Sequence, residues 1–231
     1  MRPFIKLFLL GFIINLFVLP AFASEPPPDL RLRNGISLRK KLNNRIDLRL
    51  NMEYRLFQNL SRAQQVLFEP EIQWKFASDW DLSAVYRYSQ TNRGNRFLPE
   101  HRINLALSRE WQLTDWSFSY RLGTQTELPD YFYEELSTNV NWPQEFVLRN
   151  RVQATYRIFG SRWTPEAGFE WFTKADHQTW KNHQYRIVGK WSYLISLAAS
   201  VHFFYFFEHE FNRRNAIDSH VLGIEFHYRF R

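Results

Sequence analysis

Residues 220–230, HVLGIEFHYRF, alternate between apolar and polar side chains without a break. The apolar positions are Leu222, Ile224, Phe226, Tyr228 and Phe230, and the positions between them are Gly223, Glu225, His227 and Arg229. A period of two residues is typical of a β-strand with one apolar and one polar face. Such a strand either buries its apolar face in a soluble sandwich or turns it to lipid in a transmembrane barrel. The rest of the chain has to decide between these two folds.

The same alternation recurs along the chain. It is clearest over residues 46–56, about twelve residues with the Asn43-Asn44 turn before them. A transmembrane strand needs roughly 9 to 11 residues. The segments with this pattern are residues 30–38, 46–56, 66–76, 80–88, 103–111, 116–122, 146–158, 163–171, 185–191, 195–207 and 220–230.

These segments number eleven, but bacterial barrels of this class cross the membrane an even number of times. The uncertain segment is the first, where Asn34-Gly35 is expected to form a bulge or a tight turn. The sequence therefore predicts an all-β fold, an antiparallel up-and-down transmembrane β-barrel of about 10–12 strands, with ten or twelve strands as the two options.

The connections between segments favour a barrel in lipid over a sandwich. Short turns are predicted to alternate with longer loops, the longest at about residues 124–144. Large aromatic residues lie beside the short turns: Trp74, Trp80, Trp111, Trp116, Phe159, Trp163, Trp191 and Tyr193. Folded together, they would form the aromatic ring that marks a membrane boundary. A soluble sandwich has no reason to place them there.

The start of the chain has the pattern of a secretory signal peptide. Arg2 and Lys6 precede an apolar run over residues 7–19, and Ala21-Phe22-Ala23 follows. We expect residues 1–23 to be removed and residues 24–231 to form one outer-membrane barrel domain in a Gram-negative bacterium. An uncleaved N-terminal anchor is the alternative.

Charge and cysteine content narrow the function classes. The formal net charge is +7, and loss of Arg2 and Lys6 leaves 28 basic against 23 acidic residues. These charges are interspersed along the strands, which argues against a nucleic-acid partner. The absence of Cys rules out disulfides and thiolate chemistry. Aromatic residues at 18% with a mean hydropathy of −0.46 fit lipid-facing rings that alternate with charged lumen residues.

The chain resembles two groups of proteins. Its last strand is similar to the C-terminal strand that the barrel-assembly machinery recognises in outer-membrane proteins, except that Arg231 follows the terminal aromatic residue. The order of its motifs resembles a family of uncharacterised outer-membrane β-barrels, a domain of unknown function common in Bacteroidota. The motifs are the opening strands through Glu53 and Arg55, Glu100-His101-Arg102, Tyr120-Arg121, Arg149-Asn150-Arg151, Glu170, Tyr185-Arg186 and the closing strand. The resemblance implies the fold and location but no activity.

The inward face of the predicted barrel is rich in Arg and Glu. The predicted lumen residues are Arg45, Arg49, Glu53, Arg55, Glu69, Glu71, Arg87, Arg102, Glu110, Arg121, Arg149, Arg151, Arg157, Glu166, Glu170, Arg186, His227 and Arg229. In a barrel of this size long side chains can largely fill the interior. We therefore expect a salt-bridged structural barrel, and alternatively a narrow solute pathway whose Arg-biased wall favours anions.

The competing class is an outer-membrane lipid hydrolase of the phospholipase or lipid A deacylase type. Its chemistry needs a Ser and a His in contact. Ser219 and His220 are adjacent and should point to opposite faces, and Ser200 and His202 share a face without an evident carboxylate to orient them. The third class is a soluble periplasmic β-sandwich binding protein. We expect no enzyme activity.

Cofactor and metal sites are not predicted. Four histidines fall near loop ends, where they could bind a metal only by converging: His177, His183, His209 and His220. No phosphate loop or zinc-ligand spacing is present. The expected partners are outer-membrane lipid and the barrel-assembly machinery, and the sequence leaves the oligomeric state open.

Overall fold

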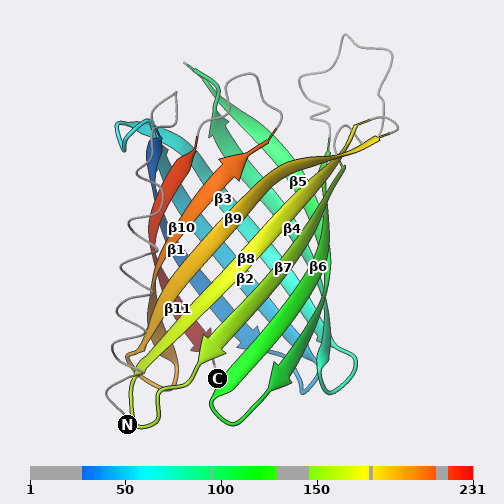
Figure 1. Cartoon of the computed structure of the whole chain (residues 1–231), viewed down its shortest axis with the longest axis vertical. Coiled ribbons are helices and arrows are strands. Elements are labelled where there is room, and N and C mark those ends of the chain that lie inside the picture. The colour runs from blue at the N-terminus through cyan, green and yellow to red at the C-terminus, as the bar shows by residue number, and fades with distance from the viewer. Residues whose placement is uncertain (1–27, 95, 129–145, 177–178, 212–217, 231) are drawn as a thin grey trace.

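The alternating segments pair edge to edge and close on themselves. The computed structural model describes residues 28–94, 96–128, 146–176, 179–211 and 218–230, and within them eleven strands form a closed barrel (Figure 1). The strands are β1 (Asp29–Lys41), β2 (Ile46–Phe57), β3 (Arg62–Lys75), β4 (Trp80–Asn92), β5 (Phe97–Gln112), β6 (Trp116–Leu128), β7 (Phe146–Tyr156), β8 (Trp163–Asp176), β9 (Thr179–Leu194), β10 (Ala199–Glu210) and β11 (Ser219–Phe230).

Each strand pairs antiparallel with the next one along the chain, and a parallel pair closes the ring. In that pair β1 lies beside β11, with Leu32 opposite Leu222 and Ile36 opposite Phe226. The predicted all-β barrel is therefore confirmed, with one difference. The sheet is mixed at its seam, whereas the sequence predicted antiparallel pairing throughout.

The eleven strands of the described residues fall within the predicted range of about 10–12, but the expectation that the number is even, ten or twelve, is wrong. Asn34-Gly35 does not make a turn or divide the first segment, and β1 runs straight through it with Gly35 opposite Glu53 on β2. The backbones are close here, since a Cβ on Gly35 would lie 3.2 Å from the Met52 carbonyl oxygen. An odd number of strands places the start of β1 and the end of β11 at opposite ends of the barrel, which is why their pairing is parallel.

The connections define two ends. The turn end carries residues 42–45, 76–79, 113–115, 157–162 and 195–198, and at the loop end β2, β4, β6, β8 and β10 end and the strand after each of them begins. The predicted alternation of short and long connections holds only in part, because residues 58–61, 93–96 and 177–178 are as short as the turns. Strands β8, β9 and β10 extend farther into polar sequence than the alternation indicated.

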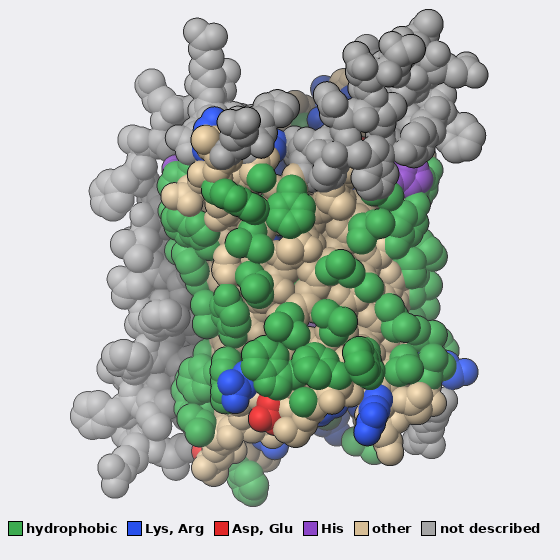
Figure 2. Space-filling model, turned by 90° about the vertical axis from the view of Figure 1, so that its right-hand side faces the viewer, with side chains coloured by type: hydrophobic (Ala, Val, Ile, Leu, Met, Phe, Trp, Pro, Cys, Tyr) green, Lys and Arg blue, Asp and Glu red, His purple; other side chains and the backbone are tan. Residues whose placement is uncertain are grey.

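Apolar side chains cover the outside of the barrel. Figure 2 shows hydrophobic side chains over the barrel wall that faces the viewer, and Lys, Arg, Asp and Glu near its lower rim. Leu48 is 39% exposed, Leu105 50% and Phe226 38%, although each belongs to the apolar row of its strand. The apolar rows thus face outward. The β-sandwich alternative, which needs these rows in a core, is wrong.

The predicted aromatic ring lies at the turn end and faces outward. Trp74, Trp111, Trp116 and Trp163 are 40–46% exposed. Neighbouring aromatic side chains of this girdle pack against each other. The ring centroids are 4.8 Å apart for Trp116 and Tyr156 and 4.7 Å apart for Trp163 and Tyr193. Amphipathic rings in this position suit the boundary between hydrocarbon and water.

The predicted signal peptide, residues 1–23, lies outside the described residues. Among the described residues no helix has the length and hydrophobicity needed to cross a membrane.

The parallel seam predicts which residue pairs can be cross-linked. In the variant Ile36→Cys with Phe226→Cys the two thiols lie directly opposite on the outer face, and the natural chain has no Cys to interfere. We expect a short bismaleimide to join them, seen as a mobility shift of the denatured protein on a gel. Leu32→Cys with Phe226→Cys is the control. Here one thiol is displaced from the other by four residues, or about 13 Å, along the strand direction. Equal cross-linking of both pairs would contradict the register.

Candidate functional site: the charged lumen

The polar rows of the eleven strands face the lumen and pair across neighbouring strands. Glu71 and Arg49 are opposite each other on β3 and β2, with Oε2 and Nη1 3.0 Å apart. Arg87 pairs with Glu69, and Arg102 with Glu127, in the same cross-strand manner. Guanidinium and carboxylate groups satisfy each other's hydrogen-bonding capacity inside the barrel. The predicted charged lumen is thus assembled mainly from neighbouring strands.

Glu170 on β8 is the centre of the largest cluster. Its side chain is 4% exposed and its Oε1 accepts a hydrogen bond of 2.6 Å from Arg149 Nη2. Arg151 Nε lies 3.4 Å from the same oxygen, and Arg186 Nη1 lies 3.6 Å from Oε2. Arg151, Glu170 and Arg186 occupy one row across β7, β8 and β9. One buried carboxylate on β8 therefore holds three cations from the two neighbouring strands, β7 and β9.

Glu208 on β10 continues the cluster toward the seam. It lies opposite Arg186, pairs with its guanidinium, and lies 3.5 Å from Arg31 Nη1 on β1. Its side chain is only 5% exposed. A second residue of β1, Arg33, lies with its Nε 3.7 Å from Glu53 Oε1 of β2. Arg55 Nε, also on β2, donates to the same oxygen at 2.6 Å. One set of ion pairs thus runs from β7 to β10 and on to Arg31 of β1, and a second set joins β1 to β2.

Two phenylalanines lie between these guanidinium groups. Arg186 Cζ lies 4.7 Å from the centroid of the Phe172 ring and 5.3 Å from that of Phe206. A second guanidinium lies over each ring, with Arg149 Cζ 5.2 Å from the centroid of Phe172 and Arg33 Cζ 4.7 Å from that of Phe206. Both rings are 5% exposed. We call this alternating arrangement of Arg33, Phe206, Arg186, Phe172 and Arg149 the lumen stack, which combines cation–π contacts with the carboxylates described above.

A third inward ring needs a glycine beside it. Phe204 on β10 is directly opposite Gly223 on β11, and a Cβ at Gly223 would overlap the Phe204 ring. Phe204 also stacks on Phe206, with ring centroids 6.2 Å apart. The glycine in the polar row of the closing strand therefore makes room for an aromatic side chain in the lumen.

Between the lumen stack and the turn end the lumen widens into a cavity of about 590 Å³. We call it the basic vestibule, because its charged lining is cationic: Arg39, Arg49, Arg121, Arg151, Lys190 and Arg229. No described Asp or Glu lines it. Carboxylates lie behind some of these cations, as Asp47 pairs with Arg39 and Glu166 lies 2.7 Å from Lys190 Nζ. A cavity with such a wall attracts anions.

Most predicted lumen residues do meet. The ones that take part in the clusters or line the cavities are Arg49, Glu53, Arg55, Glu69, Glu71, Arg87, Arg102, Arg121, Arg149, Arg151, Glu166, Glu170, Arg186 and His227. Arg229 also lines the basic vestibule, where it is exposed at the mouth. Three lie elsewhere: Arg45 is exposed in the turn of residues 42–45, and Glu110 and Arg157 line a separate cavity at the turn end.

Sequence reasoning missed several lumen residues. Glu208 was expected in a loop, but β10 continues to Glu210. Arg31, Arg33, Asp47, Glu127, Lys190 and Glu225 also belong to ion pairs that were not predicted. The signal that could have found them is the parity of each strand, because once one residue is known to face inward, every second residue does too.

The side chains considered for catalysis or metal binding are placed as follows. Ser219 is buried and His220 accepts or donates a hydrogen bond with the Tyr205 hydroxyl at 2.8 Å, so the two do point apart. His209 Nδ1 lies 2.6 Å from Asp218, and His177 lies outside the described residues. Ser200 Oγ and His202 Nε2 are 3.0 Å apart in the lumen, with Glu225 opposite His202. His202, Glu225 and His227 form the group of potential metal ligands in the described chain.

Glu170 should be essential for stability. In Glu170→Gln the three guanidinium groups lose their shared charge, and leaving buried charges uncompensated costs about 3–5 kcal/mol. Urea unfolding of the folded protein in lipid vesicles measures this loss. Glu100→Gln is the matched control, because its partner Arg93 is 62% exposed and such a pair is worth at most about 1 kcal/mol. Equal losses in the two variants would contradict the central place of Glu170.

Comparisons with known proteins give a family but no activity. No curated protein matches this chain in sequence. Among solved structures, the chain is similar to the beta domain of the Bordetella autotransporter BrkA, at 10% identity and a TM-score of 0.43, over 78% of this chain and 82% of that one. A sequence model of the family described as "Protein of unknown function (DUF2490)" matches residues 34–219, so the chain belongs to this family of unknown function.

Proposed function

We propose that this protein is a closed outer-membrane β-barrel, a structural element whose lumen is held shut by the lumen stack and its carboxylates. The observation that carries the proposal is the alternating contact of Arg149, Phe172, Arg186, Phe206 and Arg33. The apolar outer face and the aromatic ring support the membrane location. An export signal in residues 1–23 and recognition by the barrel-assembly machinery are parts of the same proposal.

The orientation follows from the turn end. In bacterial barrels the short turns face the periplasm, so we place the turn end and the end of β11 there. The basic vestibule then opens to the periplasm. The start of β1 lies at the outer end, unlike that of a barrel with an even number of strands.

A narrow anion pathway is the second candidate function. It is favoured by the cationic lining of the basic vestibule and by a further cavity of about 200 Å³ in mid-lumen, which Arg87, Arg121 and Arg149 help to line. An anion entering from the turn end would meet fixed positive charge in the basic vestibule, and in the smaller cavity it would meet arginines together with Glu69 and Glu71. Passage to the loop end would require Phe172 and Phe206 to move. A lipid hydrolase has less support, because Ser200 and His202 face the lumen and not lipid.

Conductance separates the two candidates. In planar bilayers we expect the natural protein to be silent and the double variant Phe172→Ala with Phe206→Ala to give stepwise, anion-selective conductance, since the variant removes both rings of the lumen stack. Phe169→Ala with Phe203→Ala is the control, because these rings lie on the same strands but are 40% and 44% exposed on the outer face. Stepwise conductance by the natural protein would overturn the closed lumen and establish the pathway.

Location has its own test. We expect the natural protein in the outer-membrane fraction, soluble only in detergent, and migrating faster on a gel before boiling than after it, because folded barrels resist detergent. Release by osmotic shock without detergent would contradict the membrane assignment. Fatty-acid release from dispersed phospholipid, abolished by Ser200→Ala, would establish the hydrolase instead.

A further inference from the structure

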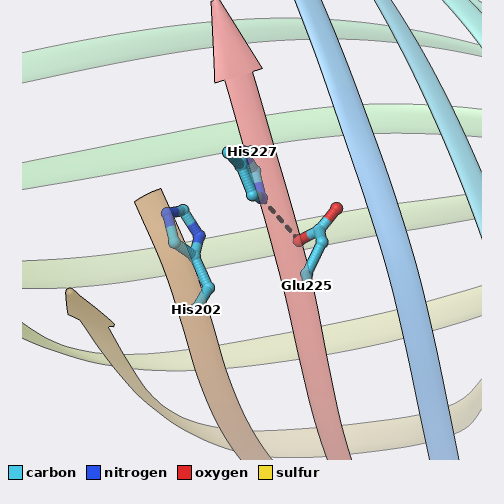
Figure 3. A group of neighbouring side chains, drawn as sticks. All are labelled: His202, Glu225 and His227. Atoms are coloured by element: carbon cyan, nitrogen blue, oxygen red, sulfur yellow. Dashed lines mark ion pairs between the residues drawn. The ribbon is translucent and has the colours of Figure 1, made fainter. Parts of the chain in front are cut away.

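A compact group of side chains lies beside the basic vestibule near the turn end, apart from the lumen stack, and its two histidines line that cavity. It comprises His202 near the start of β10 and Glu225 and His227 near the end of β11 (Figure 3). The register explains the group. His202 is directly opposite Glu225, and His227 is directly opposite Ser200, so four inward positions form a square on two adjacent strands.

The potential ligand atoms of the three residues are close. One nitrogen of each histidine and one oxygen of Glu225 all lie within 4.8 Å of one another. The His202 and His227 rings stack with centroids 3.8 Å apart and planes 18° apart. In zinc sites the ligand atoms stand about 2.0–2.2 Å from the ion. Small rotations about the side-chain bonds would place these three atoms around one ion at such distances.

One nitrogen of the group lacks a partner. His227 Nε2 lies 2.8 Å from Glu225 Oε2, as the dashed line in Figure 3 marks. The contact meets the distance for an ion pair but does not have hydrogen-bond geometry, and this buried Nε2 has no hydrogen-bond partner in the described part of the chain. A buried ring nitrogen that lies beside a carboxylate without a hydrogen bond to it costs free energy. A metal ion between the two groups would satisfy both.

We propose that His202, Glu225 and His227 bind a divalent transition metal of the zinc class. Two imidazoles and one carboxylate are a ligand set found in zinc sites that keep a fourth position open. Magnesium and calcium prefer all-oxygen ligands and do not fit this set. All three side chains are partly exposed, and both histidines line the basic vestibule, so an ion can enter from the turn end and a fourth ligand can follow it.

The surrounding charges set the character of the site. Lys190, Arg229 and Arg39 line the same cavity, and Lys190 is paired with Glu166 and Arg39 with Asp47. The positive wall opposes a free cation, and the Glu225 carboxylate offsets part of this opposition. The positive wall also favours an anionic fourth ligand over water. Ser200 Oγ, 3.0 Å from His202 Nε2, helps to fix the orientation of that ring.

Zinc titration of the untagged protein, refolded in detergent, tests the site. We expect one Zn²⁺ per chain by calorimetry, with no comparable binding of Mg²⁺ or Ca²⁺. His202→Ala, Glu225→Gln and His227→Ala should each weaken the affinity at least ~10-fold, because loss of a ligand costs no less than loss of a residue that supports one. His220→Ala is the matched control: it lies on the same strand but faces outward and bonds Tyr205. It should bind as the natural protein does.

Two outcomes would overturn the proposal. One is the absence of stoichiometric zinc binding by the natural protein, and the other is unchanged affinity in the three variants while each still shows heat-modifiable migration. If a variant does not fold, X-ray absorption of the zinc-loaded natural protein decides the question. Two imidazole ligands are expected, and an all-oxygen first shell would contradict the site.

Discussion

The pairing of β1 with β11 is the constraint on which the rest of the barrel depends. An unpaired edge strand leaves a row of N–H and C=O groups without partners, and in hydrocarbon these groups cannot turn to water. β11 supplies the partners over the whole length of β1, from Asp29 to Lys40. Because the chain has already crossed the barrel eleven times, this pair can only be parallel. Closure then fixes the inward and outward rows of every other strand, since each register follows from its neighbour.

Closure also creates the electrostatic problem that the lumen solves. The inward rows place many Arg and Glu side chains in partly or fully buried positions, and isolated buried charges are costly. On the loop side the carboxylates of Glu53, Glu170 and Glu208 each bind two or more guanidinium groups, and the Phe172 and Phe206 rings occupy the gaps between them. On the turn side the carboxylates stand behind their cations, which leaves the cavity wall positive. Ion pairs of the same kind thus give a neutralised, tightly packed lumen on the loop side and a cavity with a positive wall on the turn side.

The sequence predicted what depends on period alone. Alternation identified the barrel, the outward apolar rows, the aromatic ring and most of the lumen residues, because side-chain direction in a strand follows from position. It did not predict what depends on pairing between distant strands. The parallel seam was missed because the even-strand rule was applied to a segment that Asn34-Gly35 appeared to interrupt. The metal-ligand group was missed because it needs His202 and Glu225 in register on two strands, and register is not visible in either strand by itself.

Gly223 shows how a single polar-row position links these features. It lies on the inward row of β11 beside Glu225, and because it has no side chain it admits the Phe204 ring from the adjacent strand. Phe204 stacks on Phe206 of the lumen stack, while two residues toward the turn end of β10 lies His202 of the metal-ligand group. The aromatic side chains of β10 therefore stand between the paired charges of the loop side and the basic vestibule. An ion held by His202 would lie between these aromatic side chains and the turn end.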